Sequence, residues 1–127
     1  IVKTKPCVVL STVVKLQKGD RSEISATMQE LYAKRREKQP LEYPSAGSTF
    51  KRPEGYFAVK LIMDAGLAVA SVGGAQVSEK HCGFVINRKN ATSADVAGLI
   101  QKVTEPVQEK FGVPLEPEVI ILGDFEK

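Results

Sequence analysis

The feature that most constrains this fold is an apolar stripe within residues 93–111. Val, Leu, Ile and Phe recur there at helical spacing, at positions 96, 99, 100, 103, 107 and 111. This spacing predicts a long amphipathic helix, capped by Thr92 or Ser93 and ended by Gly112. Pro106 removes a backbone donor, so we expect a kink or a break near Glu105. An apolar helical face of this length needs a second layer to cover it.

The first forty residues predict a strand followed by a helix. Residues 7–16 are rich in β-branched side chains, which favour a strand. Asp20 and Glu23 have the spacing of a capping box, and apolar residues then recur on one helical face. We expect this helix to run to about Glu37, because Pro40 stops it.

Residues 40–53 read as an ordered functional loop. They are rich in Pro, Gly and Ser, yet they carry two aromatic side chains that can anchor the segment. Residues 56–65 then predict a shorter helix, with Phe57 and Leu61 facing inward and Gly66 ending it.

Several short strands complete the pattern. We expect a strand and turn at residues 69–74, short strands at 76–78 and 83–87, and a buried strand at 119–122. Helices and short strands mixed in this order predict an α+β fold, with a small mixed or antiparallel sheet and flanking helices.

Length and composition narrow the possible classes of protein. The 127 residues suffice for one compact domain with an appended element. A natural boundary near Pro40 divides the end of a preceding domain, residues 1–39, from a domain at 40–127. The chain begins with Ile1, so we expect a piece of a longer polypeptide.

Charge and hydropathy exclude several partners. The net charge of +3 is too small for a nucleic-acid-binding face, and no apolar run is long enough to cross a bilayer. The opening residues lack the features of a signal peptide, so a cytoplasmic location is expected.

The thiols and the one histidine give weak signals. Cys7 and Cys82 are far apart and form no CxxC pair, which predicts reduced core thiols. His81 precedes Cys82, but adjacent side chains usually point apart, so a nucleophile pair is not expected. One histidine is also too few ligands for a metal site, and we expect none. His81 could still hydrogen-bond a ligand.

Gly47, Ser48 and Thr49 place hydroxyl groups on a flexible loop beside Lys51 and Arg52. Such a loop can hold a phosphate or present a proton donor. By spacing alone it is neither a P-loop nor a nucleophile elbow, and a plain ordered turn is favoured.

Two charged stretches have an ordinary and a functional interpretation. Basic residues at positions 34, 35, 36 and 38 suit a solvated helix end, or they could clamp a diphosphate together with Lys51 and Arg52. Glu116 and Glu118 could be simple loop acids. A carboxyl at the mouth of a buried strand could also be desolvated and so stay protonated near neutrality.

Taken together and in order, these segments resemble a known family. RREKQPLEYPSAGSTFKRPEGYFAVKLI, VGGAQVSEKHCGFVINRKNATSADV and LEPEV are similar to the carboxy-terminal region of the UDP-N-acetylenolpyruvoylglucosamine reductases, the MurB-type flavoenzymes. The resemblance covers nearly the whole chain. It implies that residues 1–39 end an FAD-binding domain and that residues 40–127 form the substrate-binding domain.

The resemblance also implies a reaction in peptidoglycan precursor synthesis. NADPH reduces FAD, and the reduced flavin delivers hydride to the enolpyruvyl group of UDP-N-acetylglucosamine enolpyruvate, which gives UDP-N-acetylmuramate. The FAD would be held mainly by a part of the parent protein that precedes this chain. We therefore expect this polypeptide alone to be inactive.

Residue roles follow from the same resemblance. Ser48 would supply the proton to the carbanionic carbon, and Glu118 would act as a general acid toward the enolic intermediate. Six other residues are expected to bind substrate: Lys38, Gly47, Lys51, Arg52, Gln76 and His81. Val59 and Ile120 depart from the family pattern, since glycine and arginine are usual there. The alternative is a non-catalytic module that binds the phosphates of a nucleotide.

Overall fold

The computed structural model describes residues 8–123, and it divides the chain into two units, residues 1–32 and 33–127. The boundary falls inside helix α1, Arg21–Lys38. As predicted, Asp20 caps this helix, because its Oδ1 accepts hydrogen bonds from the backbone N–H groups of Ser22 (2.9 Å) and Glu23 (3.0 Å). The helix prediction is confirmed to within one residue at its end.

The predicted strand at residues 7–16 is not formed. Residues 8–20 have no regular secondary structure, and large apolar side chains such as Leu10 and Val13 are exposed. A β-branched segment becomes a strand only when another strand satisfies its backbone groups, and no strand of the described residues pairs with it. Cys7, predicted as a core thiol, lies outside the described residues.

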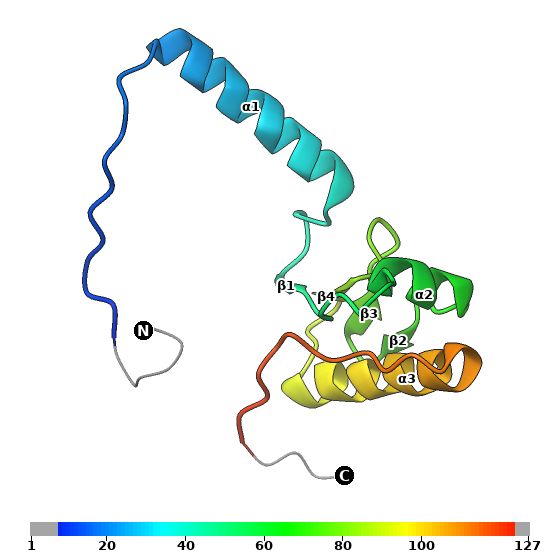
Figure 1. The fold of residues 1–127 in the computed structure, drawn as a ribbon. Coiled ribbons are helices and arrows are strands. Elements are labelled where there is room, and N and C mark those ends of the chain that lie inside the picture. Colours follow the sequence, from blue (N-terminus) through cyan, green and yellow to red (C-terminus); the bar gives the residue numbers. More distant parts are fainter. Residues whose placement is uncertain (1–7, 124–127) are drawn as a thin grey trace. The chain divides into compact units, whose positions relative to one another are not determined.

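The second unit contains a four-stranded antiparallel sheet (Figure 1). The strands are β1 (Ser45–Ser48), β2 (Ser71–Val72), β3 (Ala75–Val77) and β4 (Phe84–Asn87), in the spatial order β1-β4-β3-β2. The predicted α+β fold with a small antiparallel sheet is confirmed. The last three strands lie within one or two residues of the predicted segments.

Strand β1 corrects the prediction of a loop across residues 40–53. Its sequence, SAGS, has no β-branched residue, so composition alone favours a loop. The strand exists because it pairs with β4, in the register Ser45 with Ile86 and Ser48 with Phe84, with an irregularity between the two pairs. Pairing therefore overrides local propensity at this edge of the sheet.

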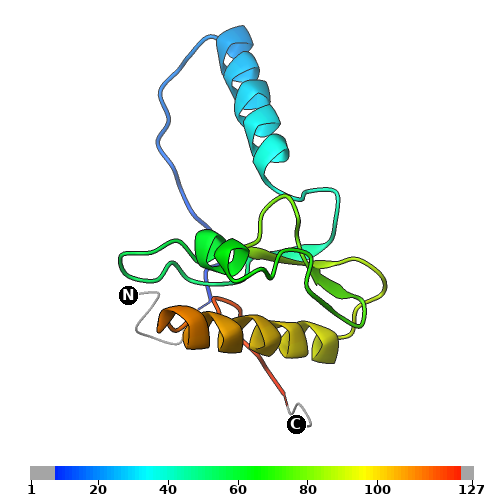
Figure 2. The same cartoon turned by 90° about the vertical axis from the view of Figure 1, so that its right-hand side faces the viewer.

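Helix α3, Ser93–Phe111, has the predicted bounds, and Figure 2 shows it running along the sheet. It contacts β2, β3, β4 and the shorter helix α2, Ala58–Asp64. Its apolar stripe lies in the core, where Leu99, Val103 and Val107 are fully buried. The predicted break near Glu105 is absent: the helix continues through Pro106, because packing of both flanking turns offsets one missing hydrogen bond.

Phe57 was expected to face inward from α2, and this expectation is wrong. It is the N-cap residue of α2 and its side chain is 58% exposed. The Arg52 guanidinium lies 4.0 Å from the centroid of its ring. Leu61 does face the core as predicted, and Gly66 follows the helix end with a positive φ of 77°.

The predicted buried strand at residues 119–122 is also wrong. This segment forms no strand, and Ile120 and Leu122 are 84% and 83% exposed. The one pairing near it is an isolated antiparallel bridge between Phe50 and Pro117. The apolar run alone did not provide the second strand that burial requires.

A two-residue turn, Gly73-Gly74, joins β2 to β3 and packs against the start of α3. Thr92 and Asp95 form a complete capping box there, which confirms Thr92 as the cap. The Asp95 carboxylate also accepts a hydrogen bond from Gly74 N–H (3.3 Å). A Cβ at Gly74 would lie 2.1 Å from the backbone oxygen of Lys89, so only glycine allows this approach.

We expect Gly74→Ala to lower the free energy of unfolding by about 1–3 kcal/mol, because the added Cβ meets backbone atoms that cannot move aside alone. Gly98→Ala is the matched control. Its Cβ would meet nothing closer than Val72 Cγ1 at 3.6 Å, and alanine in a helix should add about 0.5–1 kcal/mol. Urea unfolding of both variants measures the difference. Equal stabilities would contradict the proposed close approach.

The capping box also predicts a dependence on pH. Hydrogen bonds from the Thr92 backbone, then from the Gly74 backbone, hold the pKa of Asp95 below its ordinary 3.8. The stabilisation is therefore present above pH 3.8 and is lost as pH falls through the lower value of the folded state. We expect the stability difference between wild type and Asp95→Asn to be constant near neutrality and to change in acid. A constant difference in acid would contradict this.

Candidate functional site

The two faces of the sheet have different neighbours. Ala75, Val77 and Val85 belong to the core cluster that includes the α3 stripe. Because side chains alternate along a strand, Gln76, Phe84 and Ile86 lie on the opposite face. The register places Ser45 beside Ile86 and Ser48 beside Phe84. Polar side chains from distant parts of the sequence, Ser45, Ser48 and Gln76, thus share the sheet face that α3 does not cover.

One hollow of about 470 Å³ lies on this face, and we call it the Ser48 hollow. It brings together three of the predicted site residues, Gly47, Ser48 and His81. The Ser48 hydroxyl donates a long hydrogen bond of 3.4 Å to the carbonyl of Phe50. The other residues that line the Ser48 hollow come from the end of α1, the following loop and the sheet: Arg35, Gln39, Leu41, Ser45 and Phe84.

Gly47 shapes the strand that carries Ser48. Its φ of +89° lies in the region that favours glycine, next to the irregularity in the β1–β4 register. A Cβ at this position would meet no atom within 4 Å, so the constraint is the backbone conformation and not space.

Thr49 holds the loop after β1 in place. It is 2% exposed, its N–H donates to the carbonyl of Gly83 (2.7 Å), and its Oγ1 accepts the N–H of Val85 (3.0 Å). The hydroxyl therefore satisfies a buried backbone donor where the β1–β4 ladder is irregular.

The same loop is paired with the segment that carries Glu118. Lys51 N–H donates to the Glu116 carbonyl and Glu118 N–H donates to the Thr49 carbonyl, each at 2.8 Å. The backbone of Glu118 is therefore paired with that of Thr49, the residue that follows Ser48. Its side chain is exposed and does not line the Ser48 hollow, so the expectation of a carboxyl buried at a strand mouth is wrong.

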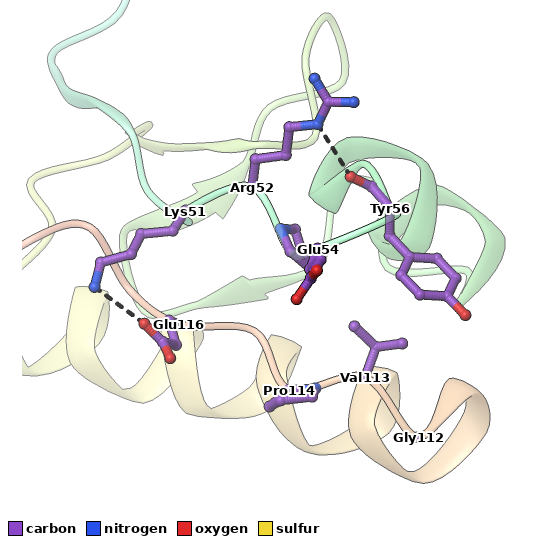
Figure 3. A pocket seen from close by; sticks show the side chains of 9 residues that line it. Lys51, Arg52, Glu54, Tyr56, Gly112, Val113, Pro114 and Glu116 are labelled. Carbon is purple, nitrogen blue, oxygen red and sulfur yellow. Dashed lines mark hydrogen bonds and ion pairs between the residues drawn. The ribbon is translucent and has the colours of Figure 1, made fainter.

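Lys51 and Arg52 line a different hollow of about 380 Å³, shown in Figure 3. Lys51 Nζ forms an exposed ion pair with Glu116 Oε2 at 3.0 Å. Arg52 Nε donates to the carbonyl of Tyr56 (3.4 Å) while its guanidinium covers Phe57. Figure 3 shows Lys51 directed to Glu116 and Arg52 directed to the Tyr56 carbonyl. Neither of the two basic residues lines the Ser48 hollow.

Gln76 lies in a third hollow of about 490 Å³, on the same sheet face as Ser48. Its Nε2 donates to the carbonyl of Val69 (3.2 Å). Arg88, also lining this hollow, places its guanidinium 4.7 Å from the centre of the Tyr43 ring. Lys80 joins Glu42 in an ion pair of 3.0 Å at the same hollow.

Lys38 lies in the last turn of α1 and is exposed. The structure thus brings Gly47, Ser48 and His81 together, places Gln76 on the same face, and puts Lys51 and Arg52 in a separate hollow. Sequence reasoning grouped Arg35 with the basic residues that could clamp a diphosphate, and the structure places Arg35 in the lining of the Ser48 hollow. Sequence reasoning missed Thr49 as a structural tie. Thr49 stood beside Ser48 in the loop, but only the fold reveals that its hydroxyl is buried.

Other candidate sites receive no support within residues 8–123. In that range no three His, Cys, Asp or Glu side chains are grouped as metal ligands would be. None of the helices in the same range has the length and apolar character needed to span a bilayer. Cys82 is a buried free thiol, and burial raises its pKa, which disfavours the reactive thiolate.

The comparisons with known proteins establish the family of the chain. Residues 39–122 match the family model described as UDP-N-acetylenolpyruvoylglucosamine reductase, C-terminal domain. The chain belongs to this family. Within the domain match lie Gly47, Ser48, Gln76, His81 and Glu118, whereas Lys38 falls one residue before it.

Full-length relatives of this reductase family share high identity with the chain. The reductase of Agathobacter rectalis is 63% identical over 125 residues, and that of Lachnoclostridium phytofermentans is 60% identical over 124 residues. In both cases 98% of this chain is covered but 40% of the relative, so the chain spans about two fifths of their length.

A solved structure supports the fold. The crystal structure of UDP-N-acetylenolpyruvylglucosamine reductase (MurB) from Thermus caldophilus superposes with a TM-score of 0.62 at 35% identity. The superposition covers 82% of this chain and 37% of that protein. The observed sheet and helices are therefore those of the reductase's carboxy-terminal domain.

We expect Thr49→Val to lower the free energy of unfolding by about 1–3 kcal/mol, because the isosteric change leaves the Val85 N–H buried without an acceptor. Thr104→Val is the control. The Thr104 hydroxyl donates to the Ile100 carbonyl (2.8 Å) inside α3, so its loss should change stability by less than about 0.5 kcal/mol. Chemical unfolding and amide exchange at Val85 measure the effect. Unchanged protection at Val85 would contradict the proposed role.

Proposed function

We propose that this chain is the substrate-binding part of a UDP-N-acetylenolpyruvoylglucosamine reductase, an oxidoreductase of peptidoglycan precursor synthesis. The observation that carries the proposal is the Ser48 hollow, where Gly47, Ser48 and His81 meet within the region that matches the reductase domain. Its substrate would be UDP-N-acetylglucosamine enolpyruvate and its product UDP-N-acetylmuramate. The predicted cytoplasmic location is part of the same proposal.

The reaction needs a proton at the carbon next to the carboxylate. Addition of hydride to the terminal carbon of the enolpyruvyl group leaves that carbon electron-rich, and the Ser48 hydroxyl would donate to it. A hydroxyl is a weak acid, but a carbanionic carbon is a strong base, so positioning alone makes the transfer feasible. The long hydrogen bond from Ser48 Oγ to the Phe50 carbonyl is readily exchanged for this contact.

Glu118 would assist as a general acid toward the enolic oxygen. Its backbone is fixed beside Thr49 by the short ladder, although its side chain is exposed in this structure. The proposed role therefore requires the Glu118 side chain to turn toward the substrate, with water excluded by the rest of the parent reductase. A rotation of an exposed side chain costs little compared with moving the paired backbone.

FAD, when bound, would supply the hydride, with NADPH as the reductant. The N-termini of the two long helices do not fit the diphosphate of a dinucleotide. The N-terminus of α1 is occupied by the Asp20 carboxylate and that of α3 by Asp95. We therefore propose that the parent protein holds FAD mainly in its amino-terminal region, outside this chain, and that this chain alone does not turn over.

Six residues are proposed to contact the substrate: Lys38, Gly47, Lys51, Arg52, Gln76 and His81. After Gly47, His81 and Gln76 are the best supported, because His81 lines the Ser48 hollow and Gln76 lies on the same face of the sheet. Lys51 and Arg52 would have to leave the Glu116 carboxylate and the Phe57 ring to reach a diphosphate. These existing partners also weaken the alternative of a module that binds phosphates through its basic loop.

The roles of Ser48 and Glu118 can be tested in a full-length reductase that carries this chain. We expect Ser48→Ala to slow the substrate-driven reoxidation of reduced flavin by about 10²–10⁴-fold, and Glu118→Gln to slow the same step. Reduction of the flavin by NADPH should be unchanged in both variants. Stopped-flow absorbance follows the two half-reactions separately.

Ser93→Ala is the control, since it removes an exposed hydroxyl at the start of α3. It should leave both half-reactions unchanged. Normal reoxidation in the Ser48 variant would exclude Ser48 as the proton donor.

A further inference from the structure

His81 is the single histidine of the chain, and its imidazole is held on two sides. The ring stands edge-on to Phe84, with centroids 4.8 Å apart and planes at 84°. On another side the backbone N–H of Gly83 donates to His81 Nδ1 at 3.3 Å. The imidazole is therefore oriented by the connection between β3 and β4, in which His81 lies, and by Phe84 of β4 while it lines the Ser48 hollow.

The contact with Gly83 decides which ring nitrogen carries the proton. A nitrogen that accepts a hydrogen bond has no hydrogen, so the neutral ring must carry its proton on Nε2. We propose that Gly83 fixes His81 as a neutral Nε2–H donor, which hydrogen-bonds an anionic oxygen of the ligand in the Ser48 hollow. This assignment rests on the function proposed above.

An anionic oxygen is the acceptor that suits this hollow. Arg35 lines it too, and Arg35 Nε donates to Gln39 Oε1 at 3.0 Å, which directs a positive charge to the same place. The substrate of the proposed reaction has two sources of such an oxygen, the enolpyruvyl carboxylate and the diphosphate. A neutral N–H donor beside a guanidinium binds either one without adding a second positive charge to the hollow.

Glycine at position 83 leaves room for this arrangement. A Cβ there would lie 3.0 Å from His81 Cε1, 3.1 Å from His81 Nδ1 and 3.2 Å from Val59 Cγ2. A side chain at this position would therefore crowd both the imidazole and a valine of α2. A methyl group at this position must displace the ring or the valine. Gly83 is therefore a positioning residue that acts through His81.

The tautomer can be measured directly on the 127-residue chain, because one imidazole gives one pair of ring ¹⁵N signals. Above the pH at which the ring protonates, we expect Nε2 to carry the hydrogen. Gly83→Ala should move the signals toward the mixture seen in an unconstrained histidine, and Gly98→Ala should leave them unchanged. A proton on Nδ1 in the wild-type chain would overturn the assignment.

A second substitution, at Val59, tests whether Val59 contributes to the crowding at position 83. Val59→Ala removes the methyl group that faces Gly83, so the double variant Gly83→Ala with Val59→Ala should recover part of the wild-type signal. General destabilisation would not restore the wild-type ¹⁵N signals, because the double variant removes core packing and should be less stable than Gly83→Ala. If both Gly83 variants keep the wild-type tautomer, Gly83 does not set it.

Function is tested in the full-length reductase. His81→Phe keeps a ring and loses the donor, and we expect the KM for the enolpyruvyl UDP-sugar to rise about tenfold or more with a smaller change in kcat. His81→Gln, whose amide N–H reaches a similar position, should recover most of the affinity. Equal KM values for wild type and His81→Phe would overturn the ligand contact.

UDP-N-acetylglucosamine, which has the diphosphate but no enolpyruvyl carboxylate, identifies the source of the oxygen. Weaker inhibition of His81→Phe by this probe assigns the contact to the diphosphate, and unchanged inhibition together with a raised KM assigns it to the carboxylate. The proposed function fails separately, by normal flavin reoxidation in Ser48→Ala, and the NMR result does not depend on that outcome.

Discussion

The arrangement of the candidate site depends on the buried backbone and side chain of Thr49. Three hydrogen bonds meet at this residue: its N–H to the Gly83 carbonyl, its Oγ1 from the Val85 N–H, and its carbonyl from the Glu118 N–H. They join the loop after β1, the start of β4 and the carboxy-terminal segment. Each partner would otherwise be a polar group near the core, so the tie is costly to break. Through it the backbone of Glu118 is paired with the residue that follows Ser48.

The two faces of the sheet have different roles because side chains alternate along each strand. Val77 and Val85 point to the core beneath α3. Their neighbours along the two strands, Gln76, Phe84 and Ile86, point to the other face. Phe84 and Ile86 make that other face apolar near the backbone, and both are buried without belonging to the main core cluster. A one-residue shift of β4 would exchange the two sets. The register is therefore a functional constraint as well as a structural one.

The sequence predicted the elements whose signal is local. The α3 stripe, the Asp20 cap and the Gly66 helix end each need only neighbouring residues, and all three are confirmed. Predictions failed where a distant partner decides. SAGS forms a strand because β4 pairs with it, whereas residues 8–16 and 119–122 have strand composition and no such partner among the described residues. The same reason explains why Ser48 could be singled out but the structural role of Thr49 could not.

Val59 shows how a departure from a family pattern can be absorbed. The family resemblance implies a glycine at this position, and the valine on α2 fills space beside Gly83. The added volume is tolerated because residue 83 has no side chain, and Val59 packs partly buried against the core cluster. A Cβ at position 83 would lie 3.2 Å from Val59 Cγ2, which is a tight contact with α2. A side chain there would crowd Val59 and His81 together, so packing on α2 and the orientation of the imidazole in the Ser48 hollow are coupled through position 83.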